Sequence, residues 1–175
     1  MTDMTASAID QAIKAENQGS AASPAEQTWS QYVTFMVNNR SYGIEITKVR
    51  EIKGWSEPTE LPNAPRGMRG VLNLRGIIVP IFDLRAQFSQ GETQACDEHV
   101  VIIVSLGDRL IGILVDAVSD ILTLEPGDIL PVPDIDASVD QRFLSGLVSK
   151  DNRLVALLRL DQLFGIGDLP LEQSA

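Results

Sequence analysis

The side chains that could do chemistry in this chain are few and scattered. His99 is the only histidine and Cys96 the only cysteine among the 175 residues. His99 adjoins an apolar run, which is more typical of a residue at the end of a strand than of a general base. Cys96 has no second cysteine with which to form a disulfide or a metal site. The sequence therefore predicts no catalytic residue, no bound metal and no cofactor.

Carboxylates offer the one enzymatic alternative, an acidic hydrolase that uses Asp83, Asp134 or Asp136. The apolar flanks of Asp83 argue against a polar pocket. Asp134 and Asp136 stand in a Pro-rich acidic loop without the glycine and further oxygen ligands of a calcium site. The sequence also lacks the phosphate-binding glycine motifs and the serine nucleophile elbow. We therefore expect a protein that binds other proteins rather than an enzyme.

An arginine in an unusual place is the first candidate for binding. Asn73–Gly76 has the pattern of a hairpin turn, in which Gly76 relieves a positive φ and Arg75 projects from the rim. A guanidinium offers five donors in a fork, which suits a carboxylate or main-chain carbonyl groups of a partner. A turn residue with no role beyond solvation is the alternative that the sequence leaves open.

The segments around this arginine occur twice in the chain. Gly70–Phe88 aligns without a gap with Gly146–Phe164, at a shift of 76 positions. Upstream, Arg40–Ile52 aligns with Arg109–Ile121, at a shift of 69 positions. Two matches in the same order indicate an internal duplication, with seven extra residues in the second half. Positions at which the copies differ are therefore candidates for function.

Two further segments are candidates for contact with partners. Ile46 and Val49 keep their apolar type in the second copy, so they are either plain core residues or the lining of a groove between the halves that accepts an apolar helix. The apolar run Ile129–Ile135 lies in the seven-residue excess of the second half. Because apolar residues in a Pro-rich loop tend to stay exposed, we expect a contact patch there.

Short strands joined by turns make up most of the chain. Hairpins are predicted around Asn38-Asn39, Arg75-Gly76, Gly107-Asp108 and Lys150-Asp151-Asn152. Thr47–Ile52 is either a short helical turn or a continuing strand, and Leu157–Phe164 could close as a short helix. Pro80 has no amide proton to donate and predicts an edge strand or a bulge. The fold class is all-β, as two small barrels or a pair of packed curled sheets.

The chain divides into one folded region between two tails. Residues 1–29 are predicted to be a disordered tail, residues 30–166 the folded domain, and residues 167–175 a C-terminal tail. The folded domain is expected to consist of two subdomains, at about 30–95 and 96–166. The N-terminus lacks the features of a signal peptide and no apolar run is long enough to span a bilayer, so a soluble cytoplasmic protein is expected.

Charge is unevenly distributed along the chain, whose net charge is −10. Residues 30–88 hold eight basic and five acidic side chains, whereas residues 89–175 hold five basic and fifteen acidic ones. The acidic balance disfavours nucleic acid as a partner. The asymmetry suits two different protein partners or head-to-tail association, and solubility alone is the competing explanation.

The duplicated hairpin also carries a family resemblance. The string Gly70–Arg85, GVLNLRGIIVPIFDLR, resembles the signature of the CheW-like domain family. Tyr42–Ile46, Val49–Ile52 and Gly112–Asp116 match the family as well. The resemblance covers roughly Gln31–Phe164, which is nearly all of the chain outside the tails.

The resemblance implies a fold and a function. The fold is a pair of SH3-like five-stranded β-barrels packed together. Family members are non-catalytic adaptors that bridge the histidine kinase CheA, through its own CheW-like domain, to the cytoplasmic tips of chemoreceptors, and the two proteins alternate in rings beneath the receptor array. The residues implied to lie at or near the receptor groove are Ile46, Val49, Glu51, Arg75 and Ile78; Leu130 and Ile135 are implied to face the kinase. An adaptor of a parallel, non-flagellar chemosensory system stays open.

Overall fold

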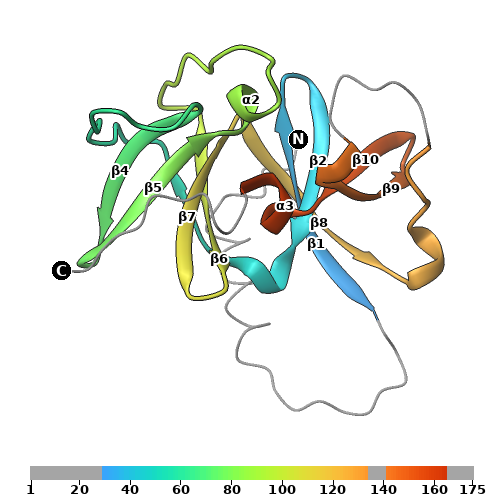
Figure 1. Ribbon diagram of the computed structural model, residues 1–175. Helices are drawn as coiled ribbons and strands as arrows, with labels where there is room; N and C mark the ends of the chain where they lie inside the picture. The colour runs from blue at the N-terminus through green and yellow to red at the C-terminus, as the bar shows by residue number, and fades with distance from the viewer. Residues whose placement is uncertain (1–28, 134–140, 165–175) are drawn as a thin grey trace.

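The computed structural model describes residues 29–133 and 141–164, which fold into two five-stranded β-sheets joined by short helical turns (Figure 1). The all-β class is confirmed. Nearly all of the predicted N-terminal tail, residues 1–28, and the whole C-terminal tail lie outside the described residues. In the described ranges, no helix has the length and apolar character that crossing a membrane requires.

The first sheet, sheet A, combines strands from both ends of the chain. Its order is β8 (Ala117–Leu124), β1 (Ser30–Val37), β2 (Arg40–Glu45), β10 (Arg153–Leu158) and β9 (Leu144–Lys150). Neighbouring strands are antiparallel except β10 and β2, which run parallel.

The second sheet, sheet B, repeats this arrangement with the equivalent strands. Its order is β3 (Val49–Gly54), β6 (Val100–Leu106), β7 (Arg109–Val115), β5 (Ile77–Asp83) and β4 (Met68–Leu74). Again one pair, β5 and β7, is parallel. Each sheet therefore presents the same five strands of the duplicated unit, consistent with two SH3-like subdomains.

The two sheets do not coincide with a division of the chain near residue 95, which corrects the expected subdomain boundaries. Sheet B is formed by the consecutive strands β3 to β7, whereas sheet A joins β1 and β2 from the start of the folded region with β8, β9 and β10 from its end. Pairing between the halves occurs twice in each sheet, between β3 and β6 and between β5 and β7 in sheet B, and between β8 and β1 and between β10 and β2 in sheet A. Neither half of the sequence therefore forms a sheet alone.

Short turns and helical segments appear where the sequence predicts them. Asn38 and Asn39 have φ angles of 52° and 64°, and Asp151 and Asn152 have 53° and 63°. Asn and Asp tolerate this left-handed region better than most residues, which explains their use at two-residue hairpin turns. Within residues 29–133 and 141–164, the short helices are α2 (Leu84–Gln87) and α3 (Leu160–Phe164), with the 3₁₀ turns η1 (Ile46–Lys48), η2 (Pro126–Asp128) and η3 (Gln141–Phe143).

Two ambiguous segments resolve in the structure. Thr47–Ile52 combines both alternatives, because the η1 turn ends at Lys48 and β3 begins at Val49. Pro80 lies opposite Val71 of β4, and β5 is an internal strand rather than an edge. The pairing of β5 with β7 begins at Ile81, so Pro80 lies just before the stretch that needs a second partner.

Three apolar clusters fill the molecule. The largest lies between the two sheets and includes Phe35, Ile44 and Ile102. Smaller clusters pack on the other faces, one around Leu157 in sheet A and one around Ile103 in sheet B. Because successive side chains of β6 point to opposite faces, this strand contributes to two clusters, and six of its seven residues are apolar. The main cluster holds the two sheets together.

Gly70, a glycine of the duplicated hairpin, allows the segment around Thr59 to pair closely with β4. Gly70 has a φ angle of 140°, and a Cβ at this position would overlap the Thr59 carbonyl oxygen. Thr59 and Val71 exchange backbone hydrogen bonds of 2.8 and 2.9 Å. In sheet B, glycine therefore permits a close backbone approach that no larger residue would.

Candidate functional site

Arg75 and Glu51, both predicted to bind a partner, form an ion pair. Their Nη1 and Oε2 atoms lie 3.1 Å apart, with the arginine side chain 78% exposed and the glutamate 20% exposed. Glu51 is on β3 and Arg75 at the tip of the β4–β5 hairpin, so the pair links strands at the two opposite edges of sheet B. The sheet must therefore curl to bring them together. Glu51 occupies one side of the guanidinium and leaves its remaining donors in solvent.

The backbone of Arg75 is in a conformation that its side chain disfavours. Its φ angle is 55°, followed by 89° at Gly76. The left-handed region costs an ordinary residue about 1 kcal/mol. The equivalent turn in the second copy has Asp151 and Asn152, which suit that region. Asn would therefore fit the backbone at position 75 better than arginine does.

Two exposed isoleucines continue the surface beside Arg75. Ile77 and Ile78 begin β5 and are 52% and 59% exposed. We call Glu51, Arg75, Ile77 and Ile78 the Arg75 surface. Exposed aliphatic side chains beside an orientable guanidinium are a combination found at the centres of protein interfaces.

Ile46 and Val49 are core residues, one of the two alternatives that the sequence left open. Val49 has no exposed surface and Ile46 only 3%, and both belong to the cluster between the sheets. Ile46 also borders a surface hollow of about 500 Å³ next to Trp29 and Thr47. In this conformation the side chains of Ile46 and Val49 are too buried to contact a partner directly.

Leu130 is exposed, and its segment adds to the edge of β9. The residue is 49% exposed and exchanges backbone hydrogen bonds of 2.7 and 2.9 Å with Leu147. This bridge is the counterpart of the one between Thr59 and Val71 in the first half. Thr59 is therefore the equivalent of Leu130. The expectation that Leu130 belongs to the seven extra residues of the second half is wrong. Ile135 lies outside the described residues.

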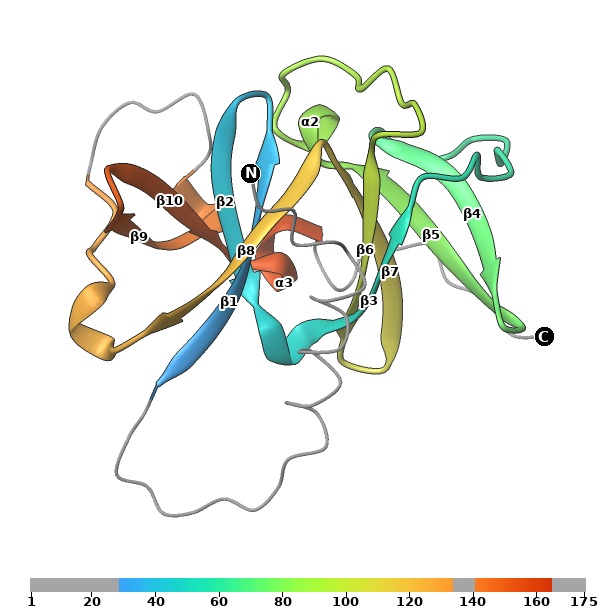
Figure 2. The ribbon, with the colours of Figure 1, turned by 180° about the vertical axis from the view of Figure 1, so that it is seen from behind.

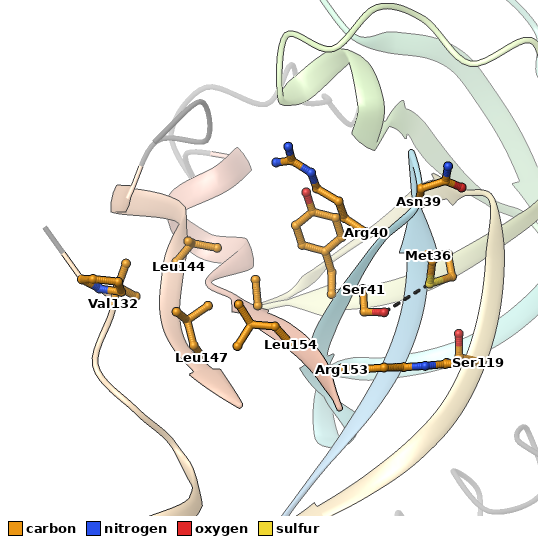
Figure 3. Close-up of a pocket in the computed structure, with 13 residues that line it drawn as sticks. Met36, Asn39, Arg40, Ser41, Ser119, Val132, Leu144, Leu147, Arg153 and Leu154 are labelled. Atoms are coloured by element: carbon orange, nitrogen blue, oxygen red, sulfur yellow. Dashed lines mark hydrogen bonds between the residues drawn. The ribbon is translucent and has the colours of Figure 1, made fainter. Parts of the chain in front are cut away.

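A groove on sheet A lies near the segment that carries Leu130. It has a volume of about 850 Å³ and lies over β2, β9 and β10 (Figure 3). Leu144, Leu147 and Leu154 are its main apolar residues, and Arg40 and Arg153 supply positive charge. We call it the β10 groove. Its composition suits a partner surface that is apolar with acidic residues at its rim.

Leu154 was not among the predicted residues, although the duplication contains the signal. At the shift of 76 positions it is the counterpart of Ile78, and both side chains are 59% exposed. The two residues occupy the same position on equivalent strands, β10 and β5. The duplicated unit therefore presents one exposed aliphatic residue on each sheet.

Figures 1 and 2 place the two surfaces on opposite sides of the molecule. The β4–β5 hairpin, which carries Arg75 and Ile78, extends away from the centre in one direction. The β9–β10 hairpin, which carries Leu154, lies on the far side of β1 and β2. Two partners could thus contact the chain without competing for the same residues.

Tyr42 forms part of the wall of the β10 groove with an unpaired hydroxyl. Its side chain is buried and stacks on Phe88, with ring centroids 5.1 Å apart, and its Oη has no hydrogen-bond partner. Burial raises the pKa of Tyr42, and the nearby Gln90 and Arg40 offset only part of this effect. The phenol therefore stays neutral in the folded protein beyond the pH at which an exposed tyrosine ionises.

Replacing Tyr42 with Phe should leave the free energy of unfolding at pH 7 unchanged or raise it by up to about 1 kcal/mol, because a buried hydroxyl without a partner costs free energy. A raised pKa in the folded state means that stability falls as the pH rises above about 10, where the unfolded chain releases its proton. In urea titrations from pH 7 to 11, the free energy of unfolding should fall less steeply with pH for the variant than for the wild type. A loss above 1 kcal/mol at pH 7 would mean that the hydroxyl is satisfied.

The carboxylate of Asp83 holds a loop in place and is not free to act in a hydrolase. It is fully buried and accepts hydrogen bonds from Thr93 N at 2.6 Å, Thr93 Oγ1 at 2.7 Å and Arg85 N at 3.1 Å. Arg69 lies 3.6 Å away and also donates to the Thr93 carbonyl oxygen. Asp134 and Asp136 lie outside the described residues. Asp83 thus fixes the segment that joins the two halves.

The chain matches known proteins over most of its length. The family model of the CheW-like domain matches residues 31–166. The chain is 35% identical to the probable chemotaxis protein CheW of Rhizobium etli, over 87% of its own length and 93% of the relative. It is 37% identical to the chemotaxis protein CheW of Klebsiella aerogenes, over 83% and 88%.

Solved structures give the same result. The crystal structure of the scaffolding protein TtCheW from Thermoanaerobacter tengcongensis superimposes with a TM-score of 0.74 at 27% identity. The match covers 83% of this chain and 94% of that one.

Proposed function

The chain belongs to the CheW-like domain family, and on this premise we propose that it is the adaptor that couples chemoreceptors to the histidine kinase CheA and lets receptors control kinase activity. The relatives it matches are named as chemotaxis and scaffolding proteins, and like them it is a non-catalytic protein. The observation that carries the proposal is the pair of separate exposed surfaces, one on each sheet.

The Arg75 surface is the proposed receptor-binding site. Arg75 is positioned by Glu51 and has donors left for a carboxylate or for carbonyl groups at the end of a receptor helix. Ile77 and Ile78 supply apolar area beside it. Ile46 and Val49 support this surface from below, since both are buried next to β3.

The β10 groove, together with Leu130, is the proposed kinase-binding site. Exposed Leu154 and Leu130 offer apolar contact, and Arg40 and Arg153 suit an acidic rim on the kinase. Because the groove and the Arg75 surface lie on opposite sides, one molecule can hold both partners. Through its partners the chain would be located at receptor arrays. Surfaces on opposite sides of the molecule are also compatible with self-association in rings.

A bridge of this kind controls the kinase through differential contacts. A small shift of the receptor changes the kinase only if the adaptor binds two kinase conformations unequally, and such coupling is typically about 1–3 kcal/mol. The main apolar cluster joins the two sheets and makes them a firm connection between the partners.

The duplication supplies a matched pair of variants to test the proposal. Ile78→Glu and Leu154→Glu change equivalent side chains of equal exposure. A charge in an apolar interface is costly, so we expect each to weaken one interaction at least about 10-fold. In pull-downs with receptor cytoplasmic fragments and the kinase, Ile78→Glu should lose the receptor alone and Leu154→Glu the kinase alone.

Loss of both partners by both variants, or of neither partner by either, would contradict the assignment of the two surfaces. Circular dichroism should be native for both, because both sites are exposed. The same pull-down addresses the alternative of a parallel non-flagellar system, by using receptors and kinases from each system of the cell.

A further inference from the structure

A buried hydroxyl in the β10 groove has no partner in the unbound chain. Tyr42 lines the groove, and its side chain is only 2% exposed. Within the described part of the chain, its Oη atom has no hydrogen-bond partner. Buried polar groups in proteins are almost always paired, so an unpaired one needs a specific explanation. A partner that enters the groove and supplies the missing hydrogen bond is such an explanation.

Two polar side chains lie near this hydroxyl without satisfying it. Gln90 and Arg40 both act on the pKa of Tyr42, but neither is placed to complete a hydrogen bond with Oη. The side-chain oxygen of Gln90 instead accepts from Asn38 Nδ2 over 3.2 Å. Arg40 has only donors and cannot accept the proton of the phenol. The proton on Tyr42 Oη therefore lacks an acceptor.

Arg40 brings a positive charge to the same end of the groove. Its side chain is exposed, and Figure 3 shows it extending from β2 toward the side of the groove on which Leu144 lies. Arg40 and Tyr42 are two positions apart on β2, so both point to the same face of the strand. Among the residues that the structure describes, no carboxylate lies within ion-pair distance of Arg40. One carboxylate would satisfy both the hydroxyl and the guanidinium.

The remaining lining of the groove suits apolar side chains around such a carboxylate. Leu144, Leu147 and Leu154 form its apolar part, and Arg153 adds a second positive charge. None of the described lining residues is acidic, so a carboxylate would meet no like charge there. The volume of about 850 Å³ is within the range of ordinary ligand pockets.

We propose that the kinase segment that enters the β10 groove carries an aspartate or glutamate, whose carboxylate accepts a hydrogen bond from Tyr42 Oη and pairs with Arg40. The inference rests on the proposed function, because it names the chemistry of the segment that binds there. The long, exposed side chain of Arg40 can rotate to admit the carboxylate. A neutral acceptor would leave Arg40 without a counter-charge, and a basic side chain would be repelled by it. The two residues thus select an acidic segment.

The test removes the hydroxyl alone. Tyr42→Phe keeps the ring, and Tyr32→Phe is the matched control, since Tyr32 is the other of the two tyrosines, is also buried and does not line the groove. Affinity for the kinase is measured by titration calorimetry. We expect Tyr42→Phe to bind the kinase at least about 10-fold more weakly, because a hydrogen bond to a charged group is lost. Tyr32→Phe should bind as the wild type does.

A double-variant cycle tests whether Tyr42 and Arg40 act on the same group. Arg40→Gln removes the charge, and it should also weaken kinase binding at least about 10-fold. If one carboxylate contacts both residues, the loss in the double variant should be smaller than the product of the two single losses. A structural effect of either change on the groove would not produce this coupling.

The outcomes separate this inference from the proposed function. Wild-type affinity in Tyr42→Phe, together with loss of the kinase in Leu154→Glu, would overturn the inference and leave the proposed kinase site in place. Single losses that multiply in the double variant would also overturn it. A destabilised Tyr42→Phe would contradict it, because the hydroxyl would then have an acceptor in the unbound chain. Wild-type affinity in Leu154→Glu would refute the kinase site itself, and the inference with it.

Discussion

Replacing Arg75 with Asn is expected to stabilise the fold and to weaken receptor capture in the same molecule. Asn tolerates the φ angle of 55° at this position, so the free energy of unfolding should rise by up to about 1 kcal/mol. The loss of the exposed guanidinium at the centre of the Arg75 surface should cost about 2 kcal/mol of receptor binding, which is roughly a 30-fold loss of affinity. Kinase capture should be unchanged.

The equivalent turn of the second copy provides the control. Asp151→Asn changes the matching position, where Asp already has a φ angle of 53° and lies at the other end of the molecule. We expect little change in stability and none in receptor affinity. Urea titration and a receptor pull-down measure the two quantities. An Arg75→Asn variant that is stabilised but captures receptor normally would show that the arginine is only a turn residue.

Replacing Asp83 with Ala should have the largest effect on stability of any single change considered for this chain. The carboxylate accepts three hydrogen bonds in a fully buried site, and its removal leaves the two donors of Thr93 and the backbone N–H of Arg85 without this partner. Loss of a buried, hydrogen-bonded charge costs about 3–5 kcal/mol. We therefore expect a lower urea midpoint and earlier hydrogen exchange in residues 89–98.

Asp108→Ala is the control for this variant. Asp108 lies in the exposed turn between β6 and β7, and such surface changes usually alter stability by less than about 0.5 kcal/mol. If Asp83→Ala were as stable as Asp108→Ala, the hydrogen bonds to Thr93 would not be holding the joining loop in solution.

Local features of the fold could be predicted because they depend on neighbouring residues. Asn38-Asn39 and Asp151-Asn152 are turn formers with the φ angles that two-residue hairpins require. The aligned segments also become equivalent strands, since β4 and β5 match β9 and β10. An internal comparison thus supplied information that a single repeat would not have contained.

The distribution of the strands over the two sheets could not be predicted in this way. A strand such as β3 or β10 has the same local pattern whether it pairs within its own half or, as the structure has it, with the other half. The choice depends on long-range pairing and on the common core between the sheets, and neither leaves a periodic signal in the sequence. The boundary expected near residue 95 failed for this reason.

The exposure of the candidate site residues could be predicted only where it depends on local structure. Arg75 is exposed as expected because it lies in a tight turn at the free end of a hairpin. Apolar periodicity could not separate buried Val49 from a groove residue, because both are apolar. Leu154 was overlooked although it is the counterpart of Ile78.

The most direct test of the adaptor asks whether one molecule holds both partners at once. Receptor cytoplasmic fragments are immobilised, and retention of the kinase is measured with and without this chain. The account predicts that the kinase is retained only when the chain is present, and that Ile78→Glu and Leu154→Glu each abolish this retention. Displacement of the kinase by the receptor, or retention that does not need the chain, would contradict two independent surfaces and with them the proposed bridge.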